Sequence, residues 1–153
     1  MLLTGNFVRA VDEKLRVAIP KQLRDAMNCL PGAGVFVAPG NDKSLAIYTE
    51  DAFQRLADRL AAAPPTQHDV RAYTRLFYGL TQRVELDGQG RIRVPAELAQ
   101  LAELNKEAIL LGVRDHLELW SKAAWEHYLA ERQSRFDEIA EAALNPAGRE
   151  AKA

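Results

Sequence analysis

The chain carries an internal repeat, and this repeat limits the folds that are open to it. Residues 7–24 and 82–99 align without gaps at an offset of 75 positions. A second match follows in the same order, where residues 45–48 align with residues 117–120. Two matches in one order are much rarer by chance than a single match. We therefore interpret the chain as two copies of one unit of roughly 60 residues.

Each copy predicts the same succession of short strands and helices. Alternating apolar residues indicate a strand, an Asp-led turn follows, and a second short strand returns to form a hairpin. A proline then begins a short helix, two apolar strands follow, and Thr49 or Ser121 is suited to cap a longer amphipathic helix. The expected hairpins span 7–19 and 83–94, the short helices 20–28 and 95–103, the later strands 34–38, 44–48, 108–113 and 117–120, and the long helices 50–62 and 122–143.

A helix is also expected between the copies. Pro64 and Pro65 end the first long helix, and Thr66 to Asp69 resembles a capping box for a new one. The following apolar residues fall on one helical face, which predicts a packed linker. Those residues are Val70, Tyr73, Leu76, Phe77 and Leu80. The predicted organisation is a first repeat at 4–62, a linking helix at 66–80, a second repeat at 81–143 and a frayed tail at 144–153.

Composition excludes several classes of protein. Cys29 is the single cysteine, so no disulfide can form within the chain, and a reduced cytoplasmic setting is expected. The longest uncharged run is broken by proline and glycine, and no secretory signal or membrane span is expected. The 20 basic and 21 acidic residues give a net charge of −1, which argues against coating of nucleic acid by bulk positive charge. Any nucleic-acid contact must come from a local patch.

The most specific motif is Asp-x-x-x-Arg followed four residues later by proline, and it occurs in both copies. It consists of Asp12, Arg16 and Pro20 in the first copy, and of Asp87, Arg91 and Pro95 in the second. One interpretation is structural: the aspartate caps the turn and the arginine forms a surface ion pair worth under about 1 kcal/mol. The other is functional: two symmetric tips present guanidinium groups that can contact phosphate or guanine in a bidentate manner.

The two copies differ in charge. Residues 5–24 have a surplus of three positive charges, whereas residues 82–99 are neutral. We therefore expect the first copy to dominate any anion binding. The basic residues of the first copy are Arg9, Lys14, Arg16, Lys21 and Arg24, and those of the second are Arg83, Arg91 and Arg93.

Other residue patterns predict no catalytic or metal site. Gly88-x-Gly90 lacks the third glycine or the Gly-Lys-Ser/Thr of a phosphate loop, and a strand follows it. The two aspartates lack the flanking residues of an aspartic protease dyad, and the nearby arginines keep them ionised. The sequence thus predicts no enzyme, cofactor, metal or small-molecule substrate. The three histidines, His68, His116 and His127, show no metal-ligand spacing with Cys29.

Three segments resemble the MraZ family of bacterial transcriptional regulators. They are DEKLRVAIPKQLR from residue 12, DGQGRIRVPAEL from residue 87 and GVRDHLELWSKAAW from residue 112. The spacer VRAYTRLFYG is also similar to the family's inter-repeat helix. The resemblance implies an α+β fold in which two tandem AbrB/SpoVT-type halves form one pseudo-symmetric swapped-hairpin β-barrel with peripheral helices.

The resemblance also implies a function and a set of contact residues. Family members form ring-shaped homo-oligomers that bind direct repeats in the promoter of the division and cell-wall gene cluster, usually as repressors. They are cytoplasmic and nucleoid-associated. The expected turn-capping residues are Asp12 and Asp87, and the expected DNA contacts are Arg16 and Arg91 for bases, with Lys14, Arg9, Arg24 and Arg93 nearby.

Two departures from the family pattern concern the balance between the halves. Leu15 stands where the family usually has glycine, so the first turn is expected to differ in backbone geometry. Ala99 stands where an arginine, matching Arg24, commonly follows the proline. Both weaken the expectation that the two halves contribute equally to binding.

The sequence leads to the hypothesis of a sequence-specific DNA-binding transcriptional regulator without enzymatic activity. The alternative from another class is a non-DNA-binding oligomeric interaction module, in which the arginines serve only their turns. Salt dependence discriminates the two, because phosphate contacts weaken steeply with salt. An enzyme on a related barrel would need a polar pocket with a perturbed acid or base, and the sequence offers no residues for one.

Overall fold

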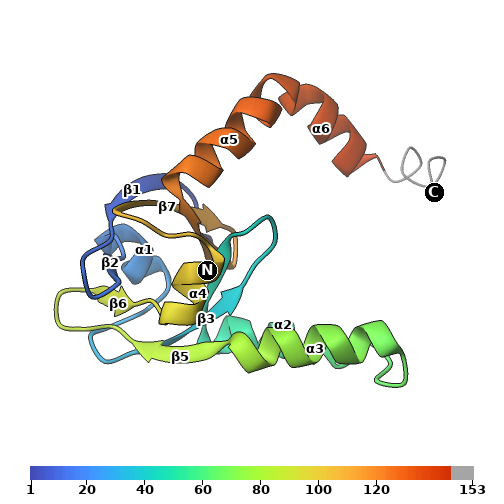
Figure 1. Ribbon diagram of the computed structural model, residues 1–153, viewed down its shortest axis with the longest axis horizontal. Coiled ribbons are helices and arrows are strands. Elements are labelled where there is room, and N and C mark those ends of the chain that lie inside the picture. Colours follow the sequence, from blue (N-terminus) through green and yellow to red (C-terminus); the bar gives the residue numbers. More distant parts are fainter. Residues whose placement is uncertain (146–153) are drawn as a thin grey trace. The chain divides into compact units, whose positions relative to one another are not determined.

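The computed structural model describes residues 1–145, which divide into a unit at Met1–Lys122 and a second unit from Ala123 onward (Figure 1). The expected α+β class is confirmed, because the chain combines helices with strands whose ladders are all antiparallel. The strands are β1 Asn6–Ala10, β2 Arg16–Ala18, β3 Gly34–Pro39, β4 Leu45–Thr49, β5 Gln82–Glu85, β6 Arg91–Arg93, β7 Glu107–Val113 and β8 His116–Ser121. The helices are α1 Lys21–Ala26, α2 Glu50–Leu60, α3 His68–Leu80, α4 Ala96–Leu101, α5 Lys122–Arg132, a 3₁₀ turn Gln133–Arg135 and α6 Phe136–Leu144.

The strands form one six-stranded sheet and one two-stranded ribbon. The sheet has the order β1-β7-β8-β4-β3-β5, and the ribbon pairs β2 with β6. In the two copies, β1 corresponds to β5, β3 to β7 and β4 to β8. If the copies are exchanged, the strand order is the same when the sheet is read from its other edge. The first strand of each copy therefore pairs with the third strand of the other copy.

The predicted hairpins are wrong in their pairing. Backbone hydrogen bonds inside the first hairpin lie at its turn, where Asp12 N–H donates to Arg16 O and Leu15 N–H to Asp12 O. Beyond the turn, β1 pairs with β7 and β2 with β6. Val17 and Ile92 are each 1% exposed and face each other at the centre of the ribbon. Burial of these two side chains requires both copies, which a local hairpin cannot supply.

The expected closed barrel does not form by hydrogen bonding within residues 1–145. β1 and β5 are the two edges of the sheet, and no ladder joins them. The core instead lies between the sheet and the ribbon, whose inward side chains belong to one buried cluster. Its largest buried members include Val17 and Ile92 from the ribbon, and Val35, Val37, Leu45, Ile47, Leu110, Leu117 and Leu119 from the sheet.

The short helices begin later than predicted. Pro20 and Pro95 are the capping residues that precede α1 and α4, with φ near −55° and extended ψ, rather than the first helical residues. Each proline follows a residue that is bonded to the other copy: Ile19 N–H donates to Gly90 O, and Val94 N–H donates to Leu15 O. The chain stays extended up to the proline because these bonds prolong the ribbon.

The longer helices agree with the sequence in part. Thr49 caps α2 as predicted, and its hydroxyl accepts from Ala52 N–H at 3.1 Å. The predicted capping box at Thr66 is absent, because α3 begins after Gln67 without a side-chain cap.

The predicted helix 122–143 is broken at Gln133–Arg135. These residues are exposed, so no burial compensates the low helix propensity of Ser134. Within the second unit, Trp125 stacks on Tyr128 at 5.7 Å. Most of the predicted frayed tail, 146–153, lies outside the described residues. Within the described part of the chain, no helix combines the length and the apolar character that a membrane crossing requires.

Helices α2 and α3 both pack on the sheet. Aromatic rings join them to the sheet and to each other. Phe53 of α2 stacks on Phe36 of β3 with ring centroids 4.3 Å apart, and on Phe77 of α3 at 6.1 Å. Phe77 is 5% exposed, whereas Leu76 on the same predicted apolar face is 66% exposed. The linker helix is therefore packed through only part of that face.

Replacement of Phe77 tests this packing. Phe77→Ala is expected to lower the free energy of unfolding by about 3 kcal/mol, because it leaves a cavity in the ring stack. Leu76→Ala is the matched control, and its expected change is within about 0.5 kcal/mol because the side chain is exposed. Urea denaturation followed by circular dichroism measures both. Equal losses in the two variants would contradict the docking of α3.

Candidate nucleic-acid interface

The two-stranded ribbon places three arginines on one face. Its register pairs Arg16 with Arg93, Val17 with Ile92, and Ala18 with Arg91. Successive side chains of a strand point to opposite faces, and Val17 and Ile92 point into the core. The remaining side chains share the outer face. We call this the arginine face, formed by Arg16, Ala18, Arg91 and Arg93.

The turns of both repeats lie beside this face. Figure 1 shows the connection from β1 to β2 and the connection from β5 to β6 on the same side of the first unit. The pairing of β2 with β6 joins them directly. Lys14 is exposed at the tip of the first turn, and Gln89 takes the equivalent place in the second. The two motifs are therefore brought together, although 75 positions separate them in the chain.

Asp12 holds the first turn and orients its arginine. One carboxylate oxygen, Oδ1, accepts from the backbone N–H of Lys14 at 3.0 Å and of Arg16 at 2.8 Å. The other, Oδ2, accepts from Arg16 Nε at 2.6 Å. The hydrogen bond from the Arg16 backbone, followed by those from its side chain and from Lys14, lowers the pKa of Asp12. The carboxylate is therefore ionised at neutral pH, and the arginine is held at a fixed angle.

Asp87 repeats this arrangement in the second turn. Its Oδ1 accepts from the backbone N–H of Gln89 and of Arg91, each at 2.9 Å, and its Oδ2 accepts from Arg91 Nε at 2.8 Å. These bonds, first that from the Arg91 backbone, lower the pKa of Asp87. The side chains of Arg16 and Arg91 remain 32% and 28% exposed. Because the aspartates engage Nε, the two Nη groups of each arginine remain available for a bidentate contact.

The arginine face carries excess positive charge. Arg93 is exposed and lies directly opposite Arg16, and it forms no ion pair within residues 1–145. Like charges directly opposite each other on adjacent strands destabilise a sheet. Asp12 and Asp87 compensate only two of the three guanidinium groups. An anion placed over this face would relieve the remaining repulsion, so the geometry favours binding of a phosphate or an electronegative base edge.

The expected difference in backbone between the two turns is not found. Leu15 has φ of +61° and Gly90 has φ of +73°, so both adopt the left-handed conformation. A residue with a side chain pays about 1–2 kcal/mol for this conformation. The carbonyls of Leu15 and Gly90 both accept a hydrogen bond from the other copy, which requires the same turn on both sides.

Arg24 lies over the turn of the other repeat. Its Nε donates to Ile19 O at 2.9 Å, and a Cβ atom added to Gly90 would lie 2.6 Å from that same nitrogen. The equivalent pair on the opposite side is Leu15 and Ala99. An arginine at 99 in the geometry of Arg24 would collide with the Leu15 side chain, so Ala99 makes room for it. The two departures from the family pattern thus compensate each other.

Arg9 is not brought to the arginine face. It lies on β1 opposite Ala108, and its Nε donates to the neighbouring Val8 carbonyl at 2.8 Å. Sequence reasoning grouped Arg9 with the turn because the two are close in the chain. The structure separates them, because β1 belongs to the six-stranded sheet and β2 to the ribbon.

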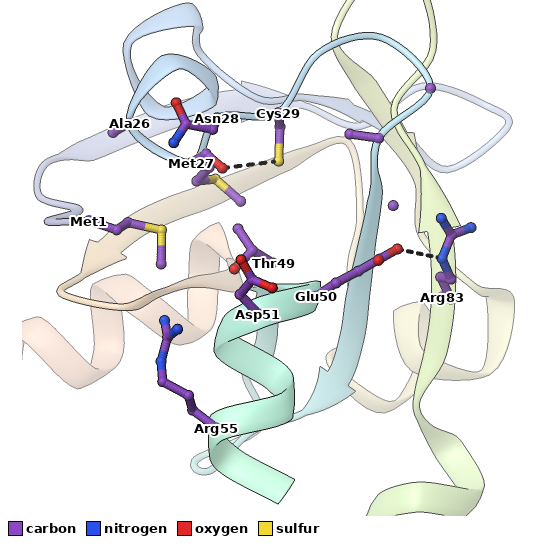
Figure 2. A pocket seen from close by; sticks show the side chains of 13 residues that line it. Met1, Ala26, Met27, Asn28, Cys29, Thr49, Glu50, Asp51, Arg55 and Arg83 are labelled. Atoms are coloured by element: carbon purple, nitrogen blue, oxygen red, sulfur yellow. Dashed lines mark hydrogen bonds and ion pairs between the residues drawn. The ribbon is translucent and has the colours of Figure 1, made fainter.

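A cavity of about 580 Å³ lies beside the start of α2 (Figure 2). Glu50 and Arg83 form an ion pair of 2.7 Å at its edge, and Asp51 and Arg55 bring a further opposite pair of charges. Cys29 is buried, and this burial raises the pKa of its thiol, so the unreactive protonated form is favoured. The side chains that line the cavity have no excess of either charge. Residues 1–145 contain no metal-ligand cluster of three or more His, Cys, Asp or Glu.

A second charged cluster surrounds His116 in β8. Its Nδ1 lies 2.8 Å from Asp115 Oδ1, its Nε2 lies 3.8 Å from Glu118 Oε2, and its ring stacks on Tyr48 at 5.1 Å. The two carboxylates, first Glu118, outweigh burial and raise the pKa of His116. Sequence reasoning missed this cluster. Asp115, His116 and Glu118 are close together in the chain, but Tyr48, whose ring stacks on His116, is not.

The chain is similar to known proteins over most of its length. A family model described as "MraZ protein, putative antitoxin-like" matches the chain twice, at residues 2–76 and 77–146. A protein of Alkaliphilus oremlandii named transcriptional regulator MraZ is 40% identical over 139 residues, covering 91% of this chain and 94% of the relative. Proteins of the same name from Salinispora arenicola and Desulfitobacterium hafniense are 33% and 34% identical, each covering 94% of this chain and 98% of the relative.

The close approach of Arg24 to Gly90 predicts energetic coupling between the repeats. Gly90→Leu is expected to destabilise the protein by about 2 kcal/mol, from left-handed strain and displacement of Arg24. In the double variant with Arg24→Ala, about 1 kcal/mol of this loss is expected to return. Leu15→Gly combined with Arg24→Ala is the control and is expected to be additive. Thermal and urea melts measure the cycle, and additivity for Gly90→Leu would disprove the contact.

The His116 cluster predicts a pH dependence of stability. The pKa of His116 is higher in the folded than in the unfolded protein. The stabilisation by protonated His116 is therefore complete below the unfolded-state pKa of about 6.5, and it is lost as the pH rises through the folded-state pKa. The free energy of unfolding should therefore decrease over that window, and His116→Gln should lack this decrease. Urea melts at pH values between about 6 and 9 measure it. Identical pH profiles for His116→Gln and the wild type would refute the assignment.

Proposed function

Because the chain belongs to the MraZ family, we propose that it is a transcriptional regulator that binds double-stranded DNA through its arginine face. The observation that carries this proposal is the register of β2 against β6, which puts Arg16, Arg91 and Arg93 on one outer face. The relatives that are similar over more than nine-tenths of the chain are named transcriptional regulators. The excess positive charge of the face matches a polyanionic partner.

The ribbon supplies the shape for base recognition. A two-stranded antiparallel ribbon fits the major groove of B-DNA, where each base pair presents a distinct pattern of donors and acceptors. Arg16 and Arg91 enter the groove with their Nη groups forward, because Asp12 and Asp87 hold them by Nε. Such a guanidinium can donate to O6 and N7 of guanine together. Holding the side chain in advance reduces the entropy lost on binding.

Residues around the ribbon set its position on the DNA. In this proposal Lys14 at the first tip and Arg24 beside the second turn contact phosphates on either side of the groove. The exposure of Lys14 and the position of Arg24 over Gly90 support these contacts. Phosphate contacts fix register and orientation without reading sequence. The two tips therefore supply positioning, and the arginine face supplies recognition. Lys14 is exposed, and Arg24 contacts the second repeat, so the first repeat contributes a positioning cation to each tip.

Assembly strengthens binding. The chain has a net charge of −1, so a single copy makes few favourable long-range contacts with DNA. We propose that several copies join into a ring and bind direct repeats in the promoter of the division and cell-wall gene cluster, as repressors within the nucleoid. Simultaneous engagement of several sites raises affinity through effective concentration, without new types of contact. The family resemblance supports the choice of target.

The exchange of strands supports a swapped-hairpin arrangement of two repeats. Each repeat sends β2 or β6 across to pair with its counterpart in the other repeat. We propose repeats at 4–62 and 81–143, joined by α3 as the linking segment. In this arrangement neither repeat can present a complete ribbon alone, so DNA recognition belongs to the pair.

Replacement of Arg16 tests the interface. Arg16→Ala is expected to weaken specific DNA binding by about 1–3 kcal/mol, and Arg16→Lys by a similar amount, because lysine keeps the charge but loses the bidentate fork. Arg55→Ala, an exposed arginine of α2 outside the face, is the control for loss of one positive charge. Fluorescence anisotropy with a duplex from upstream of the protein's own gene measures the affinities. Equal affinity of Arg16→Ala and the wild type would contradict the proposal.

Salt dependence separates this function from a protein-interaction module. Binding to DNA should weaken linearly in log K against log salt, with a slope of about −0.9 for each phosphate contacted. An interaction module whose arginines serve only their turns would show no binding to the duplex. Circular dichroism and sedimentation of each variant establish that the fold and the assembly persist. A loss of binding without loss of assembly assigns the effect to the arginine face.

A further inference from the structure

The ribbon has an approximate two-fold axis through its centre. Residues 75 positions apart are equivalent, so the central pair Val17 and Ile92 consists of two equivalent residues. Rotation about this axis exchanges Arg16 with Arg91, and it also exchanges Ala18 with Arg93. On the outer face, Arg16 and Arg91 are identical, so their exchange preserves the symmetry. Ala18 and Arg93 differ, so the symmetry is broken at this pair.

The break gives the two ends of the ribbon different charges. At the end next to the first turn, Arg16 and Arg93 face each other, and within residues 1–145 Asp12 is the single acid paired to either. At the end next to the second turn, Arg91 faces Ala18 and is paired with Asp87. Among the described residues, the first end of the face therefore holds one guanidinium without an acidic partner, and the second end holds none.

We propose that Arg93, set against Ala18, determines the direction in which each copy of the protein lies on DNA. This inference rests on the proposed DNA-binding function. A symmetric ribbon would bind a site equally well in either direction, and it would favour a palindrome. A ribbon with a third free guanidinium at one end distinguishes the two directions, because that end gains a contact that the other lacks. Arg93 thus acts as a specificity-determining residue.

The position of Arg93 supports this role over a structural one. It is exposed, it forms no ion pair within residues 1–145, and it repels Arg16 across the strand pair. It therefore costs the free protein stability. The inward neighbours Ile92 and Val94 already fill the core side of β6. A contact with DNA compensates this repulsion, whereas nothing in the described fold does so.

Direction can be measured from the two turn tips. Glu13 and Gly88 are aligned positions, both exposed, and a Cβ at Gly88 meets no atom within 4 Å. Glu13→Cys and Gly88→Cys each allow an iron chelate to be attached at one tip, and buried Cys29 is shielded from the reagent. The DNA is a duplex selected by the wild-type protein from a random-sequence library. Radical cleavage then shows which end of the site lies under each tip, and wild type treated with the reagent is the control.

We expect the chelate at residue 13 to cleave the DNA at one end of the site only, and the chelate at residue 88 to cleave it at the other end only. In the exchange variant Ala18→Arg/Arg93→Ala, which has unchanged composition and net charge, the two cleavage patterns should trade places. In Arg93→Ala alone, each tip should cleave at both ends. The wild-type preference for one orientation, about fivefold or more for a single bidentate contact, should fall to about one.

Two outcomes would overturn the inference while DNA binding stands. Cleavage at both ends by each wild-type tip would show that binding has no direction. Retention of the wild-type pattern by the exchange variant would assign direction to another asymmetry, such as Arg24 over Gly90 against Ala99 near Leu15. A selection that enriches no sequence, together with salt-independent retention of DNA, would instead refute the proposed function itself.

Discussion

The contact between Val17 and Ile92 is the constraint on which the rest of the structure depends. β2 and β6 contain only three residues each, too few to be stable as isolated strands. Their central side chains are buried in the cluster beneath, where each contributes about 1.5–3 kcal/mol. That burial needs one strand from each repeat. Once the strands meet in this register, the outward side chains on both sides of the central pair must share a face.

The Asp-Arg turn serves structure and recognition with the same atoms. Oδ1 of each aspartate holds the turn through backbone N–H groups, while Oδ2 fixes Nε of the arginine. The structural and the functional interpretations of the motif are therefore compatible. An exposed ion pair of this kind adds little stability. Its physical consequence is orientation: a long side chain is held in one direction, with its two outer nitrogens available.

Approximate symmetry and its exceptions have separate roles. The symmetric features build the fold: equivalent turns with left-handed Leu15 and Gly90, reciprocal hydrogen bonds from Ile19 and Val94, and a sheet order unchanged by exchange. The exceptions are of two kinds. In one turn a large Arg24 lies over a small Gly90, and in the other a small Ala99 corresponds to Arg24 and a large Leu15 to Gly90. The backbone of the two turns is the same. Arg93, unlike its equivalent Ala18, has no such compensation within the described fold.

The sequence by itself determined the repeat, the α+β class, the turns and the arginines, because periodicity, turn chemistry and repeated motifs are local properties. It also predicted most strands within one or two residues. Pairing was decided only by the tertiary structure: β2 joins β6 instead of β1, since burial of Val17 depends on an apolar partner 75 positions away. For the same reason, the placement of Arg24 over Gly90, the separation of Arg9 from the arginine face, and the opposition of Arg93 to Arg16 came from packing between repeats. Local patterns carry no information about that packing.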